Sequence, residues 1–218
     1  MTPTPPDDEH ASAAVLYENP LASADDLGGF RLEGDGTTSF PLGRLRLESL
    51  QPDANVVLWC PEDFPPDITV EWDFWPVREP GLCILFFHAR GRAGEDLFDL
   101  RPRTGPYDQY HHGDLDTYHV SYFRRRWAEE RAFHTCNLRK SYGFHLVAQG
   151  ADPIPDVADA DGPYRLKLTV RNGEISFAIN DLVSFRWQDQ HPLAGGKLGF
   201  RQMAPLIGEY ANLRVSRH

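Results

Sequence analysis

Apolar and polar residues alternate along much of the chain, as they do in β-strands that bury one face. In residues 67–77 (DITVEWDFWPV), the even positions from 68 to 74 are apolar, whereas Thr, Glu, Asp and Trp occupy the odd positions from 69 to 75. This period of two predicts a strand with one face in a core. Residues 81–91 (GLCILFFHARG) are apolar on both faces, which predicts a central strand that is covered on each side.

Residues 164–181 (YRLKLTVRNGEISFAIND) have the pattern of a β-hairpin. Apolar and polar residues alternate on both sides of Asn172-Gly173, a pair that tolerates the positive φ angles of a type I′ turn. Shorter strands are predicted at residues 43–50, 117–125, 143–150, 195–203 and 209–217. No long segment has the apolar stripe of a helix.

These elements predict an all-β protein. About ten short strands without helices to cover them must bury their apolar faces against one another. The arrangement that does so is a two-sheet antiparallel sandwich of the jelly-roll type. The 218-residue chain is expected to form a flexible N-terminal tail, residues 1–12, and a single jelly-roll domain, residues 13–218. The outward side chains of a concave sheet would then form an open groove.

Composition narrows the range of partners. A formal net charge of −10 and a pI near 5.3 disfavour nucleic acid and anionic membranes, which require a broad cationic surface. The sequence has neither a secretory leader pattern nor an apolar run long enough to cross a membrane. Three cysteines without a C-x-x-C spacing fit reduced thiols, so we expect a cytoplasmic protein. The oligomeric state does not follow from the sequence.

One window concentrates the candidate chemistry. Residues 133–150 (FHTCNLRKSYGFHLVAQG) contain His, Asn, Arg, Lys, Tyr and Gln but no Asp or Glu. Arg and Lys pair with the carboxylate of a uronate sugar, whereas Asn and Gln bind sugar hydroxyl groups. The composition therefore predicts an anionic oligosaccharide as ligand. The predicted binding residues of this region are Arg124, Asn137, Arg139, Lys140 and Gln149.

The same region supplies groups for proton transfer. In a β-elimination, a base removes the proton beside the substrate carboxylate and an acid protonates the leaving oxygen. His134 or His145 is the candidate base, and Tyr122 or Tyr142 is the candidate acid. The alternative is that the arginines form a solvated face and that the histidines are ordinary loop residues.

Other residues also suit sugar binding. Glu71 and Asp73 share one face of their strand with Trp75. If the groove runs over this face, the two carboxylates bind sugar hydroxyls. The alternative is that they pair with Arg or Lys on a neighbouring strand. Tyr107 and Tyr110 are candidate platforms for stacking against sugar rings.

The histidine-rich residues 107–119 (YDQYHHGDLDTYH) raise the question of a metal. Their spacing is not diagnostic of any metal centre, so no metal ligand is predicted there. The cofactor requirement is unknown from sequence, and a structural Ca²⁺ ion, common in similar sandwiches, has no locatable site.

The order of several segments resembles the YesU-like family of unknown function, whose fold is similar to that of concanavalin A-like lectins and glucanases. The segments are YENPLA, LEGDG, VVLWCPEDFPPDITVEWDFWP, GLCILFFHARG, YHVSYFRR, FHTCNLRKSYGFHLVAQGADPIP and YRLKLTVRNGEISFAIN. The resemblance extends from Tyr17 to Val215, and HTCNLRK is its most specific part. It implies a concanavalin A-like jelly roll and a role in handling sugars, and it transfers no catalytic residue.

One departure bears on mechanism. Glucanases of similar fold carry Glu-x-Asp-x-x-Glu on one strand, and their paired carboxylates act as nucleophile and acid. Here Pro76 stands in the place of the last Glu, which disfavours a retaining glucanase. Three functions remain open: an enzyme acting on an acidic oligosaccharide as a lyase or glycoside hydrolase, a non-catalytic carbohydrate-binding protein, and a sandwich that docks a protein partner.

Overall fold

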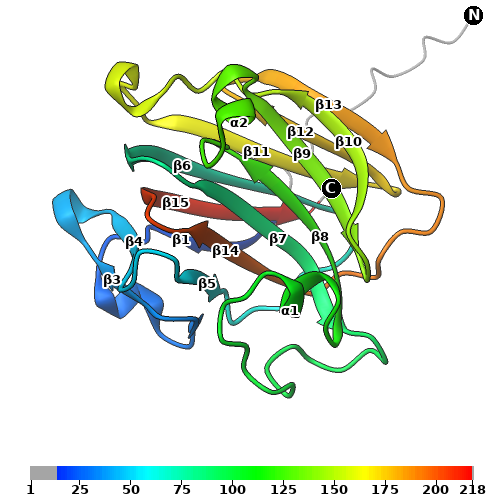
Figure 1. Cartoon of the computed structure of the whole chain (residues 1–218). Coiled ribbons are helices and arrows are strands. Elements are labelled where there is room, and N and C mark those ends of the chain that lie inside the picture. The colour runs from blue at the N-terminus through cyan, green and yellow to red at the C-terminus, as the bar shows by residue number, and fades with distance from the viewer. Residues whose placement is uncertain (1–13, 218) are drawn as a thin grey trace, which may run out of the picture.

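Two antiparallel β-sheets pack face to face in this protein (Figure 1). The structure, a computed structural model, describes residues 14–217, so the tail expected at residues 1–12 lies outside the described residues. The described part contains fifteen strands, and the prediction of an all-β two-sheet sandwich is confirmed. The main core between the sheets explains why neither sheet needs covering helices.

Sheet A runs through seven strands in the order β13 (Leu182–Gln188), β12 (Glu174–Ile179), β11 (Tyr164–Arg171), β6 (Ile68–Arg78), β15 (Ile207–Arg217), β4 (Leu45–Ser49) and β3 (Gly36–Ser39), with β1 (Val15–Asn19) paired to β15. Sheet B has the order β10 (His145–Ala151), β9 (Thr135–Ser141), β8 (Leu115–Tyr122), β7 (Leu82–Gly91), β14 (Lys197–Met203), β5 (Asn55–Trp59) and β2 (Arg31–Glu33). The helices are short: α1 (Asp108–His111), α2 (Ala128–Ala132) and three 3₁₀ turns, η1 (Ala24–Leu27), η2 (Pro41–Gly43) and η3 (Val157–Asp159).

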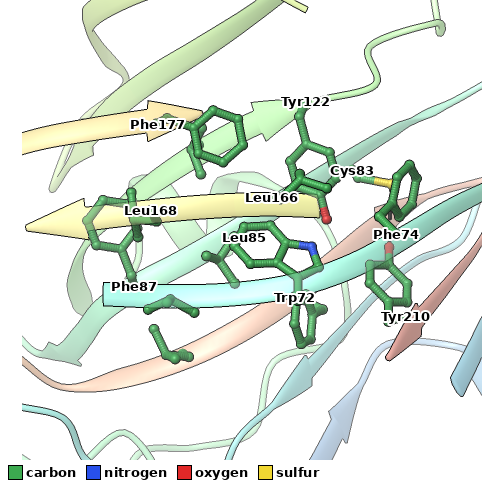
Figure 2. Close-up of a cluster of buried hydrophobic side chains, with 14 of the residues drawn as sticks. Trp72, Phe74, Cys83, Leu85, Phe87, Tyr122, Leu166, Leu168, Phe177 and Tyr210 are labelled. Carbon is green, nitrogen blue, oxygen red and sulfur yellow. Dashed lines mark hydrogen bonds between the residues drawn. The ribbon is translucent and has the colours of Figure 1, made fainter. Parts of the chain in front are cut away.

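The main core follows the alternation read from the sequence. The even positions of β6 from Ile68 to Phe74 are buried in the core between the sheets, and Figure 2 shows Trp72 and Phe74 there with Cys83 and Leu85 of β7. The predicted strand with one face in the core is therefore confirmed.

Strand β7 is covered on both sides, as its continuous apolar run predicts. Cys83, Leu85 and Phe87 belong to the main core, whereas Ile84 and Phe86 belong to a second apolar cluster on the outer face of sheet B. Residues 92–114, which connect β7 to β8, lie over this outer face and contribute Leu97 and Tyr110 to the second cluster.

The predicted hairpin joins β11 to β12. Asn172 and Gly173 have φ angles of 49° and 78°, which fit the type I′ turn expected of an Asn-Gly pair. The next turn, from β12 to β13, is built alike, since Asn180 and Asp181 have φ angles of 48° and 64°. These two tight turns fix the register of β11, β12 and β13 at one edge of sheet A.

The connections at the two ends of β8 leave part of the outer face of sheet B uncovered. Figure 1 shows α1 beside the start of β8 and α2 beyond its other end. The 92–114 segment thus covers β5, β14 and the first part of β8, and the adjoining part of β7, β8 and β9 is where the candidate site lies. No helix within residues 14–217 is long and apolar enough to cross a membrane.

Candidate functional site

A cavity of about 230 Å³ lies on the outer face of sheet B. We call it the groove. Its floor is formed by residues of four strands: Leu82, Ile84, Ser121, Asn137, Arg139 and Met203. Its walls come from three connections and carry the aromatic residues Tyr107, Trp127 and Phe144 together with Arg124 and Glu130. An apolar and aromatic lining with a few polar side chains is the composition of a small-molecule pocket.

Strand alternation brings the polar floor together. Val120 of β8 and Leu138 of β9 fill the main core, so the residues next to them must point outward. Ser121 lies opposite Asn137, and His119 lies opposite Arg139. Opposite residues of an antiparallel pair have their Cβ atoms about 5 Å apart, so these four side chains form one polar cluster.

Arg139 carries a charge that no acidic side chain neutralises within residues 14–217. Its guanidinium group lies 3.7 Å from the centre of the Phe144 ring, and Nη1 donates to the Phe144 carbonyl oxygen at 3.0 Å. No ion pair to Arg139 occurs in this part of the chain. Burial lowers the pKa of Arg139, yet an arginine stays charged at neutral pH.

Arg124, in contrast, is already paired. Its Nη2 atom lies 2.6 Å from Glu130 Oε1, and its Nη1 atom donates to Thr135 Oγ1 at 2.7 Å. The other Glu130 oxygen accepts from the backbone N–H of Arg126 at 2.9 Å. The ion pair lies within the connection that carries Trp127, and the hydrogen bond to Thr135 joins this connection to β9. Arg139 is left as the cation available to an anionic ligand.

An amide pair lies beside these arginines. Gln149 of β10 donates from Nε2 to Asn137 Oδ1 at 2.8 Å. Rotation of the Asn137 amide by half a turn instead lets its oxygen accept from Arg124 Nη1 at 2.9 Å. The Asn137 oxygen thus accepts from Gln149 in one orientation and from Arg124 in the other.

Tyr107 is the start of a hydrogen-bonded chain that runs down to the sheet. Its hydroxyl oxygen lies 2.6 Å from Nδ1 of His119, Nε2 of His119 lies 3.0 Å from Ser141 Oγ, and Ser141 Oγ donates to the Gly143 carbonyl oxygen at 2.7 Å. Burial, with the nearby Arg139 charge, lowers the pKa of His119 well below its usual value. His119 is thus a neutral imidazole beneath the groove.

Arg201 lies beneath the 92–114 segment. Its guanidinium carbon is 4.7 Å from the centre of the Tyr107 ring and 5.1 Å from that of Tyr110. It is fully buried, and its Nη1 atom donates to the Gly105 carbonyl oxygen at 2.8 Å. Within residues 14–217 it has no acidic partner, so Arg201 adds a second positive charge behind the wall of the groove.

The sequence matches a domain of unknown function, DUF1961, over residues 14–215. The chain belongs to the DUF1961 family. It is 53% identical over 213 residues to the uncharacterized protein YesU of Bacillus subtilis strain 168, a match that covers 94% of this chain and 97% of that protein. The resemblance stated from the sequence is therefore confirmed.

Solved structures agree with this family membership. A Bacillus subtilis protein of unknown function with a galectin-like fold has a TM-score of 0.91 and 54% identity, covering 94% of this chain and 96% of that one. The carbohydrate recognition domain of Emp47p has a TM-score of 0.66 at 13% identity, covering 95% and 98%. The DUF1961 chain thus has a lectin-type sandwich fold.

Five of the residues predicted from sequence gather at the groove of this DUF1961 protein. Arg124, Asn137, Arg139 and Tyr107 line it, and Gln149 is joined to Asn137 by the hydrogen bond described above. They come from β9, β10 and two connections, so only the folded sheet brings them together.

Two predicted tyrosines are buried instead. Tyr122, the candidate acid, points into the main core, where Figure 2 shows it near Trp72 and Cys83. Tyr110 is stacked on Phe86 in the second cluster, with ring centres 5.4 Å apart. Burial raises the pKa of both hydroxyls. Neither ring reaches the groove, so the structure removes Tyr122 as an acid and Tyr110 as a sugar platform.

Four other candidates of the basic window lie away from the groove. His134 contacts Arg125 and Asp156 in the connection that follows α2. Tyr142, in the β9–β10 turn, packs under the Arg92 guanidinium at 4.0 Å. His145 is exposed at the start of β10. The structure does not bring these side chains to the cluster formed by Asn137 and Arg139.

Lys140, the fourth candidate that lies away from the groove, forms an ion pair with Asp189. Its Nζ atom lies 2.6 Å from Asp189 Oδ2 and donates to the His191 carbonyl oxygen at 2.6 Å. Burial tends to raise the pKa of Asp189, but the hydrogen bonds from Lys140 and Tyr118 outweigh it and the pKa is lowered. Lys140 therefore ties β9 to the connection that follows β13.

The carboxylates of β6 lie on the opposite sheet. Asp73 pairs with Arg165 at 2.6 Å and accepts from Asn212 at 2.7 Å, and Glu71 lies 3.9 Å from Lys167 Nζ. Trp75 of the same face lies under Arg44. Glu71 also lines a separate cavity of about 360 Å³ between β1, β6 and β15. Cross-strand pairing, one of the two interpretations of Glu71 and Asp73, is what the structure has.

The sequence interpretation missed several residues of the groove region: Ser121, Trp127, Glu130, Phe144, His119 and Ser141. Alternation within residues 117–125 already put Ser121 and His119 on one face, and this was the available signal. Within residues 14–217, no three His, Cys, Asp or Glu side chains are grouped as metal ligands would be.

Proposed function

We propose that this protein binds an acidic, uronate-containing oligosaccharide in the groove of sheet B. The observation that carries the proposal is Arg139, a cation without an acidic partner in the described chain, set among amides and aromatic rings. A buried or half-buried charge without a counterion is costly. A carboxylate on the ligand supplies the missing counterion, and the guanidinium plane suits a two-point contact with it.

The remaining groups of the groove suit the other parts of a sugar. The amides of Asn137 and Gln149 and the hydroxyl of Ser121 match ring hydroxyl groups. Tyr107, Phe144 and the half-exposed Trp127 offer faces and edges for sugar C–H groups. The sandwich is that of the Emp47p carbohydrate recognition domain, and this likeness of fold supports a sugar ligand, whereas the acidic character rests on Arg139 alone.

Hydrolysis by paired carboxylates lacks support in the groove. Glu130 is the one acidic side chain that lines the cavity, and it is engaged by Arg124. Retaining and inverting mechanisms both need two carboxyl groups across the scissile bond. Binding of the acidic sugar is therefore the function that the groove favours. Three buried free thiols suit a reducing compartment, and we place this function in the cytoplasm.

Binding to a panel of oligosaccharides tests the proposal. We expect calorimetry to detect oligoglucuronate, oligomannuronate or oligogalacturonate, and not a neutral cello-oligosaccharide of the same length. Arg139→Gln removes the charge but keeps the size, and it should weaken uronate binding by about tenfold to a hundredfold, since hydrogen bonds to charged groups contribute about 1.5–3 kcal/mol.

The matched control is Arg186→Gln, because Arg186 is an exposed arginine of β13 on sheet A. Its affinity for the uronate should equal that of the wild type. Absence of binding to every acidic oligosaccharide, or equal binding by the wild type and Arg139→Gln, contradicts the proposal. Recovery of a protein partner without any glycan binding would favour the docking function instead.

A further inference from the structure

The direction of the hydrogen-bonded chain below the groove is fixed by its last member. A carbonyl oxygen only accepts, so Ser141 must use its one hydroxyl hydrogen on Gly143. His119 must then donate from Nε2 to Ser141. A neutral imidazole has a single N–H, so Nδ1 of His119 is unprotonated and accepts from the Tyr107 hydroxyl. The chain therefore holds a proton acceptor against the phenol.

This phenol lies next to the carboxylate-binding arginine. His119, to which the Tyr107 hydroxyl is bound, is the residue directly opposite Arg139 on the neighbouring strand. In a uronate, the acidic C5–H bond is on the carbon that bears the carboxylate, and the glycosidic oxygen is on C4. A sugar whose carboxylate pairs with Arg139 thus brings both reacting bonds toward the Tyr107 oxygen.

We propose that the groove is a catalytic site for β-elimination, in which Tyr107 acts as base and then as acid and His119 accepts the phenolic proton of Tyr107 for the duration of the step. This inference rests on the proposed binding of a uronate. Tyr107 passes its phenolic proton to Nδ1 of His119 and takes the C5 proton. The C5–H electron pair forms a C4=C5 double bond, and the C4–O bond breaks. The leaving oxygen takes the proton from Tyr107, and His119 returns its proton to Tyr107.

The step balances without another reactant. The products are a 4,5-unsaturated uronate and a shortened sugar with a free hydroxyl group, so no water is consumed and nothing is oxidised. Because one phenol serves as base and then as acid, the C5 hydrogen and the C4 oxygen must lie on the same face of the ring. Glucuronate and mannuronate linked through O4 meet this condition, whereas galacturonate does not.

Burial raises the pKa of Tyr107 and lowers that of His119, so the proton stays on the phenol in the free protein and its transfer depends on the charge that the substrate brings. In the free protein, burial and the charges of Arg139 and Arg201 disfavour a protonated His119. A substrate carboxylate on Arg139 offsets one of these charges. Arg201, whose guanidinium faces the Tyr107 ring, then stabilises the phenolate. The other histidines named from the sequence, His134 and His145, contribute nothing to this step because they do not line the groove.

Turnover of the same oligosaccharides tests the inference. We expect the wild type to produce ultraviolet absorbance from the C4=C5 double bond with oligoglucuronate or oligomannuronate, and the product masses should sum to the substrate mass. Tyr107→Phe keeps the aromatic wall but removes the proton, so turnover should fall by about a hundredfold or more while the dissociation constant changes less than about threefold. The control Tyr164→Phe, which alters a hydroxyl bonded to Asp161, should keep full turnover.

A second variant tests the inference independently, in case Tyr107→Phe does not fold. Ser141→Ala removes the acceptor that orients His119, so it should lower the turnover number more than the affinity, with a circular dichroism spectrum like that of the wild type. A wild type that binds a uronate oligosaccharide and never cleaves it overturns the catalytic inference and leaves the proposed function intact. Products that have gained water, cleavage of oligogalacturonate alone, or full turnover by Tyr107→Phe also overturn it. Failure to bind any uronate refutes the proposed function itself.

Discussion

At the scale of single residues, the position of a side chain in its strand decided whether a candidate reached the groove. Asn137 and Arg139 are odd-numbered residues of β9 and face outward, whereas Lys140 shares the parity of Cys136 and Leu138, which are in the core. Lys140 stays on that inner face near the end of the strand, where its Nζ atom pairs with Asp189 and lies 5.6 Å from the centre of the Tyr118 ring. Composition alone gave these residues equal weight, and alternation separates them.

The contact between Lys140 and Asp189 yields a prediction about stability. Lys140→Met should lower the free energy of unfolding by about 2 kcal/mol, because it leaves a largely buried carboxylate without its cation. Chemical denaturation measures this change. The control is Lys167→Met, whose partner Glu71 is 3.9 Å away on an exposed face, and which should cost about 0.5 kcal/mol or less. Equal losses in the two variants would contradict a structural role for Lys140.

At the scale of strands and connections, the fold was predictable and the walls of the groove were not. Alternation identified β6, β11 and β12 with their buried faces, because a core on one side imposes a period of two on a strand, and a continuous apolar run identified β7. The 92–114 segment and the α2 connection carry no such period. Their positions depend on contacts far away in sequence, such as that between Arg201 and Gly105. Trp127 and Glu130 of the α2 connection were therefore missed.

The edges of the two sheets meet where β10 passes β13, and a glycine makes this approach close. A Cβ atom on Gly150 would lie 1.9 Å from the Ser184 carbonyl oxygen. Gly150→Ala should therefore force the edges apart and cost about 1–3 kcal/mol in the free energy of unfolding. It should also weaken ligand binding, since β10 carries Gln149 beside the groove.

Gly28→Ala is the control for Gly150→Ala, because a Cβ atom on Gly28 would meet no close neighbour. In Gly28→Ala the added Cβ atom meets only the Asp25 carbonyl oxygen at 3.5 Å, an ordinary contact, so this variant should unfold like the wild type. Thermal unfolding of both variants, followed by circular dichroism, separates the two expectations. A Gly150→Ala protein as stable as Gly28→Ala would show that the β10–β13 approach is not tightly packed.

At the scale of the whole molecule, the buried histidines set how stability responds to acid. His88, with a φ of 51° in β7, is 1% exposed, and neither of its ring nitrogens has a hydrogen-bond partner among residues 14–217. Burial lowers the pKa of His88 to about 4, a shift that Asp67 only partly opposes. An unfolded chain binds a proton at this residue below its ordinary pKa of about 6.5, whereas the folded protein does not bind it until about pH 4.

The sign of the effect follows from this difference. The stability that depends on neutral His88 is complete above pH ~6.5 and declines as the pH falls toward 4, because the unfolded state binds the extra proton. Between pH 7 and pH 5 the loss from His88 alone should be about 2 kcal/mol, measured from denaturant unfolding at both values. His88→Asn, in which asparagine accepts the positive φ, removes this titration and should flatten the decline by that amount. His119, also neutral and buried, continues to contribute in the variant, so a residual decline is expected, and an unchanged decline in His88→Asn would exclude His88 as a source of acid sensitivity.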